Sequence, residues 1–510
     1  MNFEQPLAGL YEELAADRMS YLERGRKCAE MTIPSLLPPE GFHSSRDFYV
    51  PYQSVGARGV NTLANKLLIA LLPPNTPFFR LLIDDYTLEE LTKDEDARAE
   101  VEEILSTHER SIMTDISKSN LTSPVVEALK LLIVSGNVLI TFNKAGKARV
   151  FRLDSYVVRR DHDGKVLDTI IKETLKYGRL SDDLKALVDE ARKAPQKDES
   201  DVELFTCYRY RDGKYVTYQE IEKTRIPGTD GSYKESEAPF LPLRWTQIDG
   251  EHYGRGHVEE YIGDLNQLEG LSQALSEGAI ASARLLFLLK PGSTTKQKAL
   301  TEAPNASVVI GDEDDIGVLQ ANKINDFRVA QQQMEAIEQR LSFAFLMNTA
   351  IQRQAERVTA EEIRFMAGEL EDALGGVYAL LSDEMQLPLV RMRMALLIRQ
   401  KKIPKLPEEI VEPSIVTGLE ALGRGHDLTK LDIFMNKIAL LGPSALRRVK
   451  EGDLITRIGA SLGIDTDGLL KSDEEIAEED RQALQQQQMG EIAKAATPAV
   501  AKAATEQSSQ

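Results

Sequence analysis

The stretch from Asn325 to Lys402 constrains the fold most, because it is long, has few helix-breaking residues and divides into two apolar seams with a polar hinge between them. In its first half the apolar positions recur in alternating steps of three and four, which predicts one helix with a narrow apolar stripe. The other face is rich in Gln and Glu, so we expect this helix to contact partners along a seam and solvent elsewhere. The stripe consists of Phe327, Ala330, Met334, Ile337, Leu341 and Ala344.

The second half of the stretch predicts another helix. Thr359 and Glu362 form a T-x-x-E capping box, and apolar residues continue at helical spacing to Leu381. Pro388 is expected to kink or end that helix, because its ring clashes with the carbonyl of Glu384 and it donates no amide hydrogen bond. Periodicity alone favours a helical hairpin inside an ordinary bundle.

The rest of the chain predicts a mixed α+β protein that is predominantly α-helical. The first 70 or so residues are helical with loops. Between Asn137 and Trp245 the period shifts towards two, which predicts a small mixed or antiparallel sheet, interrupted by a charged helical insertion near 181–197. The expected strands are 138–142, 148–153, 156–160, 166–174, 202–210 and 215–222.

The chain then returns to helix. A helix is predicted from His257 to Phe287, and a compact segment with a strand at Ser307–Ile310 separates it from the helix that begins near Asn325. A last helical region is expected at 417–470. The Gln- and Ala-rich stretch 485–510 is expected to be disordered.

Composition excludes several classes of protein. No apolar run approaches the roughly 20 residues that span a bilayer, and the N-terminus has no signal-peptide pattern, so we expect no membrane contact and synthesis in the cytoplasm. The net charge of −19 argues against a protein that grips nucleic acid over a broad surface. It is compatible with a wall past which DNA slides, since an acidic surface repels phosphates over about 8 Å. Charge alone leaves that reading and plain solubility both open.

No candidate for catalysis, cofactor binding or metal binding has the required spacing. The acidic run Asp312–Asp315 begins like a calcium loop, but Lys323 stands where the bidentate Glu belongs. The segment Gly423–Asp427 lacks the residues of a phosphate-binding or dinucleotide loop. Cys28 and Cys207 are too few and too far apart for a disulfide framework or a thiolate metal site.

Two histidines leave one enzymatic alternative open. His252 and His257, with Glu259 and Glu260 nearby, could ligate a metal in a cytoplasmic enzyme, although no H-E-x-x-H or comparable motif is present. A structural role for these histidines is favoured. A chain of this size without a recognisable catalytic cluster is more typical of an assembly protein than of an enzyme.

Several sequence blocks, in order, resemble the head-to-tail connector (portal) proteins of T7-like podoviruses over nearly the full length of the chain. Residues 293–325 and the C-terminal tail match least. The blocks are Thr32–Gly41, Gln53–Leu67, Ile248–Leu265, Arg340–Arg364, Glu369–Arg391 and Glu412–Leu428.

The resemblance implies a portal fold with long stem helices, a small β-containing wing and a clip inserted between the stem helices. On this basis the chain would divide into a wing (1–255, with the sheet at about 137–245), stem helix 1 (256–288), clip (289–325), stem helix 2 (326–348), tunnel loop (349–358), a long kinked helix returning to the wing (359–410), a crown (411–484) and a tail (485–510).

The resemblance also implies a function and partners. The expected protein is a homo-oligomeric ring, usually of twelve subunits, at one vertex of the virion capsid, assembled in the host bacterial cytoplasm. Double-stranded DNA would pass through its channel without sequence specificity during packaging and ejection. The terminase large subunit, scaffolding, major capsid, tail adaptor and internal core proteins would be its partners, and no cofactor or catalytic residue is expected. A tail adaptor that docks on a portal is the alternative within this class.

Two sets of site residues follow from the resemblance. The expected DNA contacts in the tunnel loop are Arg353, Arg357, Gln352 and Gln354. An equally good reading pairs the two arginines with Glu356 and Glu361. The residues expected to pack stem helices of neighbouring subunits are Phe327, Met334, Ile337, Leu341, Leu265 and Leu268.

Overall fold

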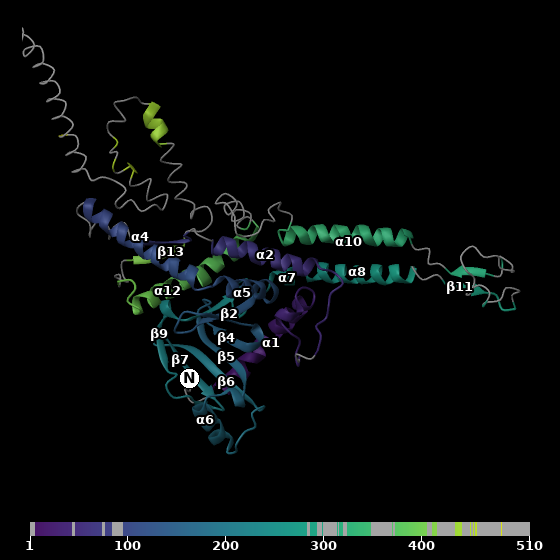
Figure 1. Ribbon diagram of the computed structural model, residues 1–510, viewed down its shortest axis with the longest axis horizontal. Helices are drawn as coiled ribbons and strands as arrows, with labels where there is room; N and C mark the ends of the chain where they lie inside the picture. The colour runs from purple at the N-terminus through teal and green to yellow at the C-terminus, as the bar shows by residue number, and fades with distance from the viewer. Residues whose placement is uncertain are drawn as a thin grey trace, which may run out of the picture. The chain divides into compact units, whose positions relative to one another are not determined.

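Figure 1 shows a computed structural model of the chain, which divides into two compact units, Met1–Gly418 and Leu419–Gln510. In the second unit the longest described stretch is the helical segment 434–440. The strands and long helices described below all belong to the first unit. The structure describes residues 6–42, 46–73, 77–83, 95–282, 286–292, 298, 314, 316–319, 324–347, 370, 373–404, 411–415, 434–440, 449, 452, 454–455 and 481.

A buried helix lies at the centre of the first unit. This helix, α5 (Thr122–Ser135), packs against α1 (Leu7–Glu30) and α2 (Val55–Leu71), and its residues from Leu131 to Ser135 are all buried. A helix that is apolar on nearly every side is stable only when other elements cover it on all sides. The apolar composition of this segment suits that interior position.

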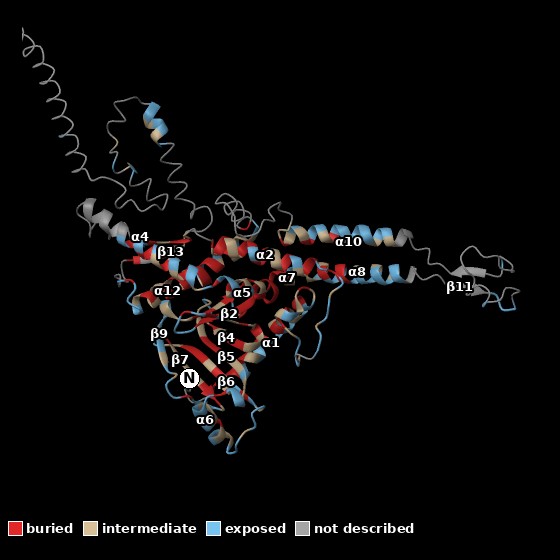
Figure 2. Ribbon diagram, viewed as in Figure 1, coloured by how far each residue is buried: buried red, intermediate tan, exposed pale blue. Residues whose placement is uncertain are grey.

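A three-stranded antiparallel sheet continues from α5. The helix ends at Gly136, whose φ of 75° lies in the left-handed region that favours glycine, and the chain enters β2 (Asn137–Phe142) directly. β2 pairs with β3 (Ala148–Phe151) on one side and β10 (Phe240–Arg244) on the other. Every residue of β2 is buried, so this sheet is part of the central core (Figure 2).

A second antiparallel sheet carries the remaining strands predicted between 137 and 245. β6 (Asp201–Arg211) and β7 (Lys214–Ile221) join through Asp212 and Gly213, both with positive φ, in the two-residue turn that an Asp-Gly pair favours. The charged insertion is α6 (Asp182–Arg192), between β5 and β6. The strands run in the order β4 (Tyr156–Arg160), β5 (Val166–Lys176), β6 (Asp201–Arg211), β7 (Lys214–Ile221) and β8 (Thr224–Arg225), with β9 (Gly231–Lys234) on β7.

Two long antiparallel helices extend from this body side by side (Figure 1). A short helix, α7 (His257–Glu260), precedes the first of them, α8 (Ile262–Ser282), and α10 (Ile324–Ala344) is the second. The prediction that the first helix continues to Phe287 is wrong, because Leu286–Leu289 form β11, which pairs with β12 (Ile316–Leu319). An unbroken apolar run of this length suits a strand as well as a buried helix, so periodicity could not distinguish them. The predicted strand at 307–310 lies outside the described residues.

The helix around Pro388 continues through the proline. Residues 373–381 are helical, Ser382–Gln386 form a π-helical turn, and α12 (Leu387–Arg399) follows without interruption. The wider turn lies immediately before Pro388, where an ordinary α-helix would bring the proline ring against the carbonyl of Glu384. The proline therefore changes the hydrogen-bond pattern of this helix and does not end it.

The chain closes the first unit with a strand. β13 (Val411–Ile415) pairs antiparallel with β1 (Phe79–Ile83), which lies next to α4 (Glu95–Lys118). The structure thus places residues 411–415, predicted to begin the crown, in the first unit. Most of the predicted crown and the tail from 485 lie outside the described residues.

Candidate functional site: the helical hairpin and its anchors

The four residues expected to contact DNA are in a part of the chain that the structure does not describe. Gln352, Arg353, Gln354 and Arg357 fall between Met347, the last described residue of α10's C-terminal turn, and Leu370. The structure does describe both flanks of this segment. What those flanks contact determines how firmly its two ends are held.

The residues expected to pack neighbouring subunits together lie mainly inside one chain. Leu265, Leu268, Ile337 and Leu341 are each 0% exposed in the isolated chain, within the core shared by α8, α10 and α2. Met334 is partly buried, with its Sδ 3.5 Å from the Ser272 hydroxyl. Phe327 lies against Gly278. These side chains hold α8 to α10, and the four fully buried ones have no surface to offer another subunit.

The C-terminus of α10 is fixed by two side chains from other elements. Leu346 has a φ of 54°, and the amides of Leu346 and Met347 donate back to the carbonyls of Phe343 and Ser342, which is the pattern of a Schellman end. The buried Lys66 of α2 donates its Nζ to the Leu346 carbonyl at 2.8 Å. The point at which the chain leaves α10 is therefore fixed.

His257 supplies the second contact to this helix end. A carbonyl can only accept, so the Nε2–H of His257 donates to the Ala344 carbonyl, at 2.9 Å. The ring is enclosed by Trp245, Tyr261 and Phe345, with centroid distances of 5.1–5.5 Å. Burial lowers the pKa of His257, and the hydrogen bond to Ala344 opposes that shift only in part. The imidazole is neutral in the folded protein at neutral pH.

This neutrality predicts that acid destabilises the chain. Burial also lowers the pKa of His252, whose Nδ1 accepts a hydrogen bond from the Arg160 amide at 3.3 Å. Because both folded-state pKa values lie below the unfolded value of about 6.5, the unfolded chain binds more protons as the pH falls through that value, and stability decreases. Melting temperatures measured at pH 7.5 and 5.5 should show this loss, and His257→Gln should reduce the difference. His162→Gln, at an exposed site, should leave it unchanged.

The helix on the other flank is anchored by Glu384. This carboxylate lies in the π-helical turn and accepts from the Arg244 Nη2 at 2.6 Å, the Arg244 Nε at 3.1 Å and the Arg244 backbone amide at 3.2 Å. The Arg160 Nη1 lies 3.8 Å from it. Burial lowers the pKa of Arg160 to about 10, although Glu384 opposes the shift. One carboxylate is thus the counter-charge nearest to two buried guanidinium groups, from β10 and β4.

Three more side chains, with four contacts, fix the same helix to the body. The Tyr378 hydroxyl donates to the Ala70 carbonyl at 3.1 Å, and the Gln386 amide donates to the Leu71 carbonyl at 2.6 Å. Both acceptors lie in the last turn of α2, whose carbonyls have no partner within the helix. Arg393 pairs with Asp115 at 3.2 Å and donates to the Gly146 carbonyl at 2.7 Å. The flanking helices therefore contact the body at several points.

Sequence reasoning did not single out Lys66, Arg244 or Glu384. Lys66 carried a usable signal, because it falls on the apolar face of α2 beside Leu63, where an unpaired charge would be costly. Arg244 and Glu384 are 140 positions apart, and no local pattern pairs them.

The metal-site alternative finds no support among the described residues. His252 and His257 are engaged by backbone groups, as described above, and Glu259 pairs with Arg24 at 3.2 Å. Within the described ranges no group of three or more His, Cys, Asp or Glu side chains is arranged to hold a metal ion. In the same ranges, no helix is both long and apolar enough to cross a membrane.

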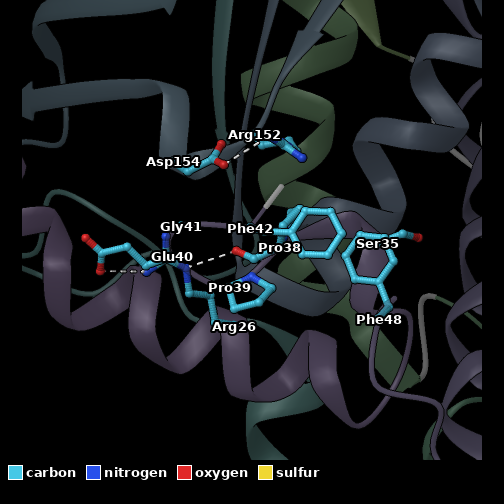
Figure 3. A pocket seen from close by; sticks show the side chains of 10 residues that line it. All are labelled: Arg26, Ser35, Pro38, Pro39, Glu40, Gly41, Phe42, Phe48, Arg152 and Asp154. Carbon is cyan, nitrogen blue, oxygen red and sulfur yellow. Dashed lines mark hydrogen bonds and ion pairs between the residues drawn. The ribbon is translucent and has the colours of Figure 1, made fainter. Parts of the chain in front are cut away.

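A cavity of about 520 Å³ lies beside the loop that follows α1 (Figure 3). One wall is the stacked pair Phe42 and Phe48, whose ring centroids are 4.1 Å apart. Its arginines are engaged by neighbouring groups. Arg26 donates to the Pro38 carbonyl at 3.2 Å, and Arg152 lies 3.1 Å from Asp154. This cavity has no nucleophile next to a base and offers no catalytic arrangement.

Comparisons with known proteins give a consistent result. Residues 4–470 match the family described as bacteriophage head to tail connecting protein. The chain is 42% identical over 497 residues to the portal protein of Escherichia phage T7, which covers 96% of this chain and 92% of that protein. It is 42% identical over 479 residues to the portal protein of Enterobacteria phage T3, which covers 91% of this chain and 88% of that protein.

A solved structure is also similar. The neck of an empty GTA particle shares 12% identity, with a TM-score of 0.39, over 81% of this chain and 90% of that chain. A likeness this low supports no conclusion about the present chain.

Proposed function

The chain belongs to the bacteriophage head to tail connecting protein family, and we infer from this membership that it is the portal protein of a phage head. The observation that carries the inference is 42% identity to a portal protein over 96% of the chain. A portal connects the head with the tail and is the route by which DNA enters and leaves. Double-stranded DNA is therefore the polymer that passes through the assembly.

We propose that copies of the chain form a homo-oligomeric ring, with twelve as the expected number, around a central channel. In this arrangement α8 and α10 are the stem, the β11–β12 segment belongs to the clip, the body with its two sheets is the wing, and residues 349–358 are the tunnel loop. The anchoring contacts support this assignment, because the end of α10 before the loop and the helix from Tyr378 onward both contact the same body.

The expected partners follow from this placement. The clip would receive the terminase large subunit during packaging and tail adaptor proteins afterwards. Scaffolding and major capsid proteins would surround the wing, and internal core proteins would meet the crown. ATP hydrolysis would belong to the terminase, so we expect no enzymatic activity of this chain. Assembly would take place in the host cytoplasm and the finished ring would reside at one capsid vertex.

Electron microscopy of the purified protein tests the proposal directly. Rings with a central channel, and a native mass near twelve copies of the 56.8 kDa chain, are the expected result. A protein that stays monomeric or dimeric at micromolar concentration, with or without scaffolding protein, would contradict the ring.

The tunnel loop supports a functional prediction. Arg353 and Arg357, repeated around a ring, would form a band of positive charge in an acidic protein, able to contact phosphates transiently. The double substitution Arg353→Ala and Arg357→Ala should leave rings intact but lower the amount of DNA packaged or retained. Lysines at both positions should preserve packaging, since the band depends on charge. An unchanged genome yield in intact heads of the alanine variant would contradict a role in DNA contact.

A further inference from the structure

An exposed apolar loop is held rigidly against α8. In this loop, residues 46–54, three large side chains are solvent-exposed: Tyr49 (42%), Val50 (79%) and Tyr52 (51%). Adjacent exposed apolar side chains are unusual on a surface that stays in water. The cluster is therefore a candidate contact surface.

Glu269 of α8 is the residue that holds this loop. It is 7% exposed, and its carboxylate accepts from the Tyr49 hydroxyl at 2.6 Å and from the amides of Tyr52 and Gln53 at 2.8 and 3.2 Å. Charge-assisted bonds of this kind are stronger than neutral ones. Gln53 also donates its side-chain amide to the Met31 carbonyl at 2.7 Å. A loop fixed in this way loses little conformational entropy when a partner covers it.

α10 carries a second exposed apolar surface. Val329, Ala336 and Phe343 recur every seven residues, so they form one stripe along the helix, and Val329 and Phe343 are 67% and 70% exposed. This stripe faces away from Ile337 and Leu341, the buried residues that pack against α8 and α2. Figure 2 shows α10 exposed along most of its length. The small Ala336 lies between two larger side chains about 10 Å away on either side.

The loop and the stripe lie on opposite sides of the hairpin at the same level. Figure 1 shows α10 on one side of α8 and the purple segment between α1 and α2 on the other. Along the hairpin, Asp264 pairs with Arg340 and Ser272 contacts Met334. Between these two pairs, Ala336 of α10 lies at the same height along the hairpin as Glu269 of α8. The loop that carries the exposed Val50 and the small residue Ala336 therefore lie at the same height along the hairpin.

We propose that loop 46–54 of one copy of this chain docks on the Val329–Ala336–Phe343 stripe of the next copy, with Val50 seated at Ala336. The inference rests on the ring proposed above. Two different surfaces at one level, on opposite sides of the same protomer, make a head-to-tail contact that can close into a ring. In this contact the subunit interface of the stem is formed by the Val329–Ala336–Phe343 stripe of α10. The neighbouring copy then covers the apolar residues of α10 that do not pack against α8 and α2.

Engineered cysteines test the contact in the assembled protein. The native Cys28 and Cys207 are buried, which raises the pKa of each thiol to about 12, so neither reacts with a maleimide near neutral pH. Val50→Cys combined with Ala336→Cys, treated with a short bismaleimide, should give a ladder of covalent oligomers on a denaturing gel. Either single variant should give none. The matched control is Val50→Cys with Gln331→Cys, an exposed position on another face of α10, which should also give none.

A charge substitution provides an independent readout. Val50→Lys should abolish ring formation, and Ala336→Glu in the same chain should restore it. Ile104→Asp, which charges a 43% exposed apolar site on α4, should leave rings intact. Rings without a Val50–Ala336 ladder, a ladder from Val50→Cys alone, or rings that tolerate Val50→Lys would overturn the docking while leaving the portal function standing. Wild-type protein that forms no rings would overturn the portal proposal itself.

Discussion

Glu384→Gln is expected to lower the free energy of unfolding by about 3–5 kcal/mol, because it leaves two buried guanidinium groups without a counter-charge. The Arg160 and Arg244 side chains are each 4% exposed, and Glu384 is 18% exposed. Gln preserves the size of the side chain but replaces one of the two accepting oxygens with a donor, so the loss combines the missing charge with a missing hydrogen bond to Arg244. Urea denaturation at constant pH gives the value.

Glu237→Gln is the matched control for this prediction. Glu237 pairs with Arg399 of α12, the helix that continues from the π-helical turn with Glu384. The Arg399 side chain is 53% exposed, so this pair lies at the surface. Solvent screens such a pair, so its loss should cost less than about 1 kcal/mol. Equal losses in the two variants would show that the charge of Glu384 does not stabilise the two buried arginines. The comparison matters for function, because Glu384 anchors the helix that follows the proposed tunnel loop.

Local patterns predicted the elements of the fold well. The alternating steps of three and four identified α10 nearly to its ends, and the alternation of period two located the strands that became β6 and β7. They were less informative about which elements pack together. The apolar stripe through Ile337 and Leu341 predicts that another element buries it, and in this fold the elements that bury it are α8 and α2 of the same chain. The second stripe, at Val329, Ala336 and Phe343, was not predicted, because the Gln- and Glu-rich composition of that side of the helix obscured it; the structure shows that it is exposed.

The anchoring contacts could not be predicted because their partners are far apart in sequence. Glu384 meets Arg244 and Arg160, and Lys66 meets the carbonyl of Leu346, across gaps that no periodicity spans. The proposed tunnel loop rests on a different kind of information. The resemblance of ordered sequence blocks predicts that the polar hinge after α10 lies in a channel, and the family match supports the portal function.

One of those blocks contains a close crossing of the chain. Residues 254–256, on the way from the body into α7, pass over the C-terminus of α5, where the Asn137 side chain donates to the Gly254 carbonyl at 2.8 Å. The Trp245 amide also donates to the Gly136 carbonyl at 2.9 Å. A Cβ at Gly256 would lie 2.6 Å from the Val134 carbonyl oxygen and 2.9 Å from that of Ile133. The body and the first long helix are therefore joined where only glycine fits.

Gly256→Ala should destabilise the chain by about 2–3 kcal/mol, because the added methyl group forces two packed backbones apart. The φ of −79° at Gly256 suits alanine, so the loss is steric and does not come from backbone strain. Gly270→Ala is the matched control: this position lies in the interior of α8, and a Cβ there would meet nothing within 4 Å. Replacing an exposed helical glycine with alanine should stabilise the unassembled chain by about 0.5–1 kcal/mol. The same substitution thus has opposite signs at two sites on the path into the hairpin, and urea midpoints that shift in the same direction for both variants would contradict a tight crossing at Gly256.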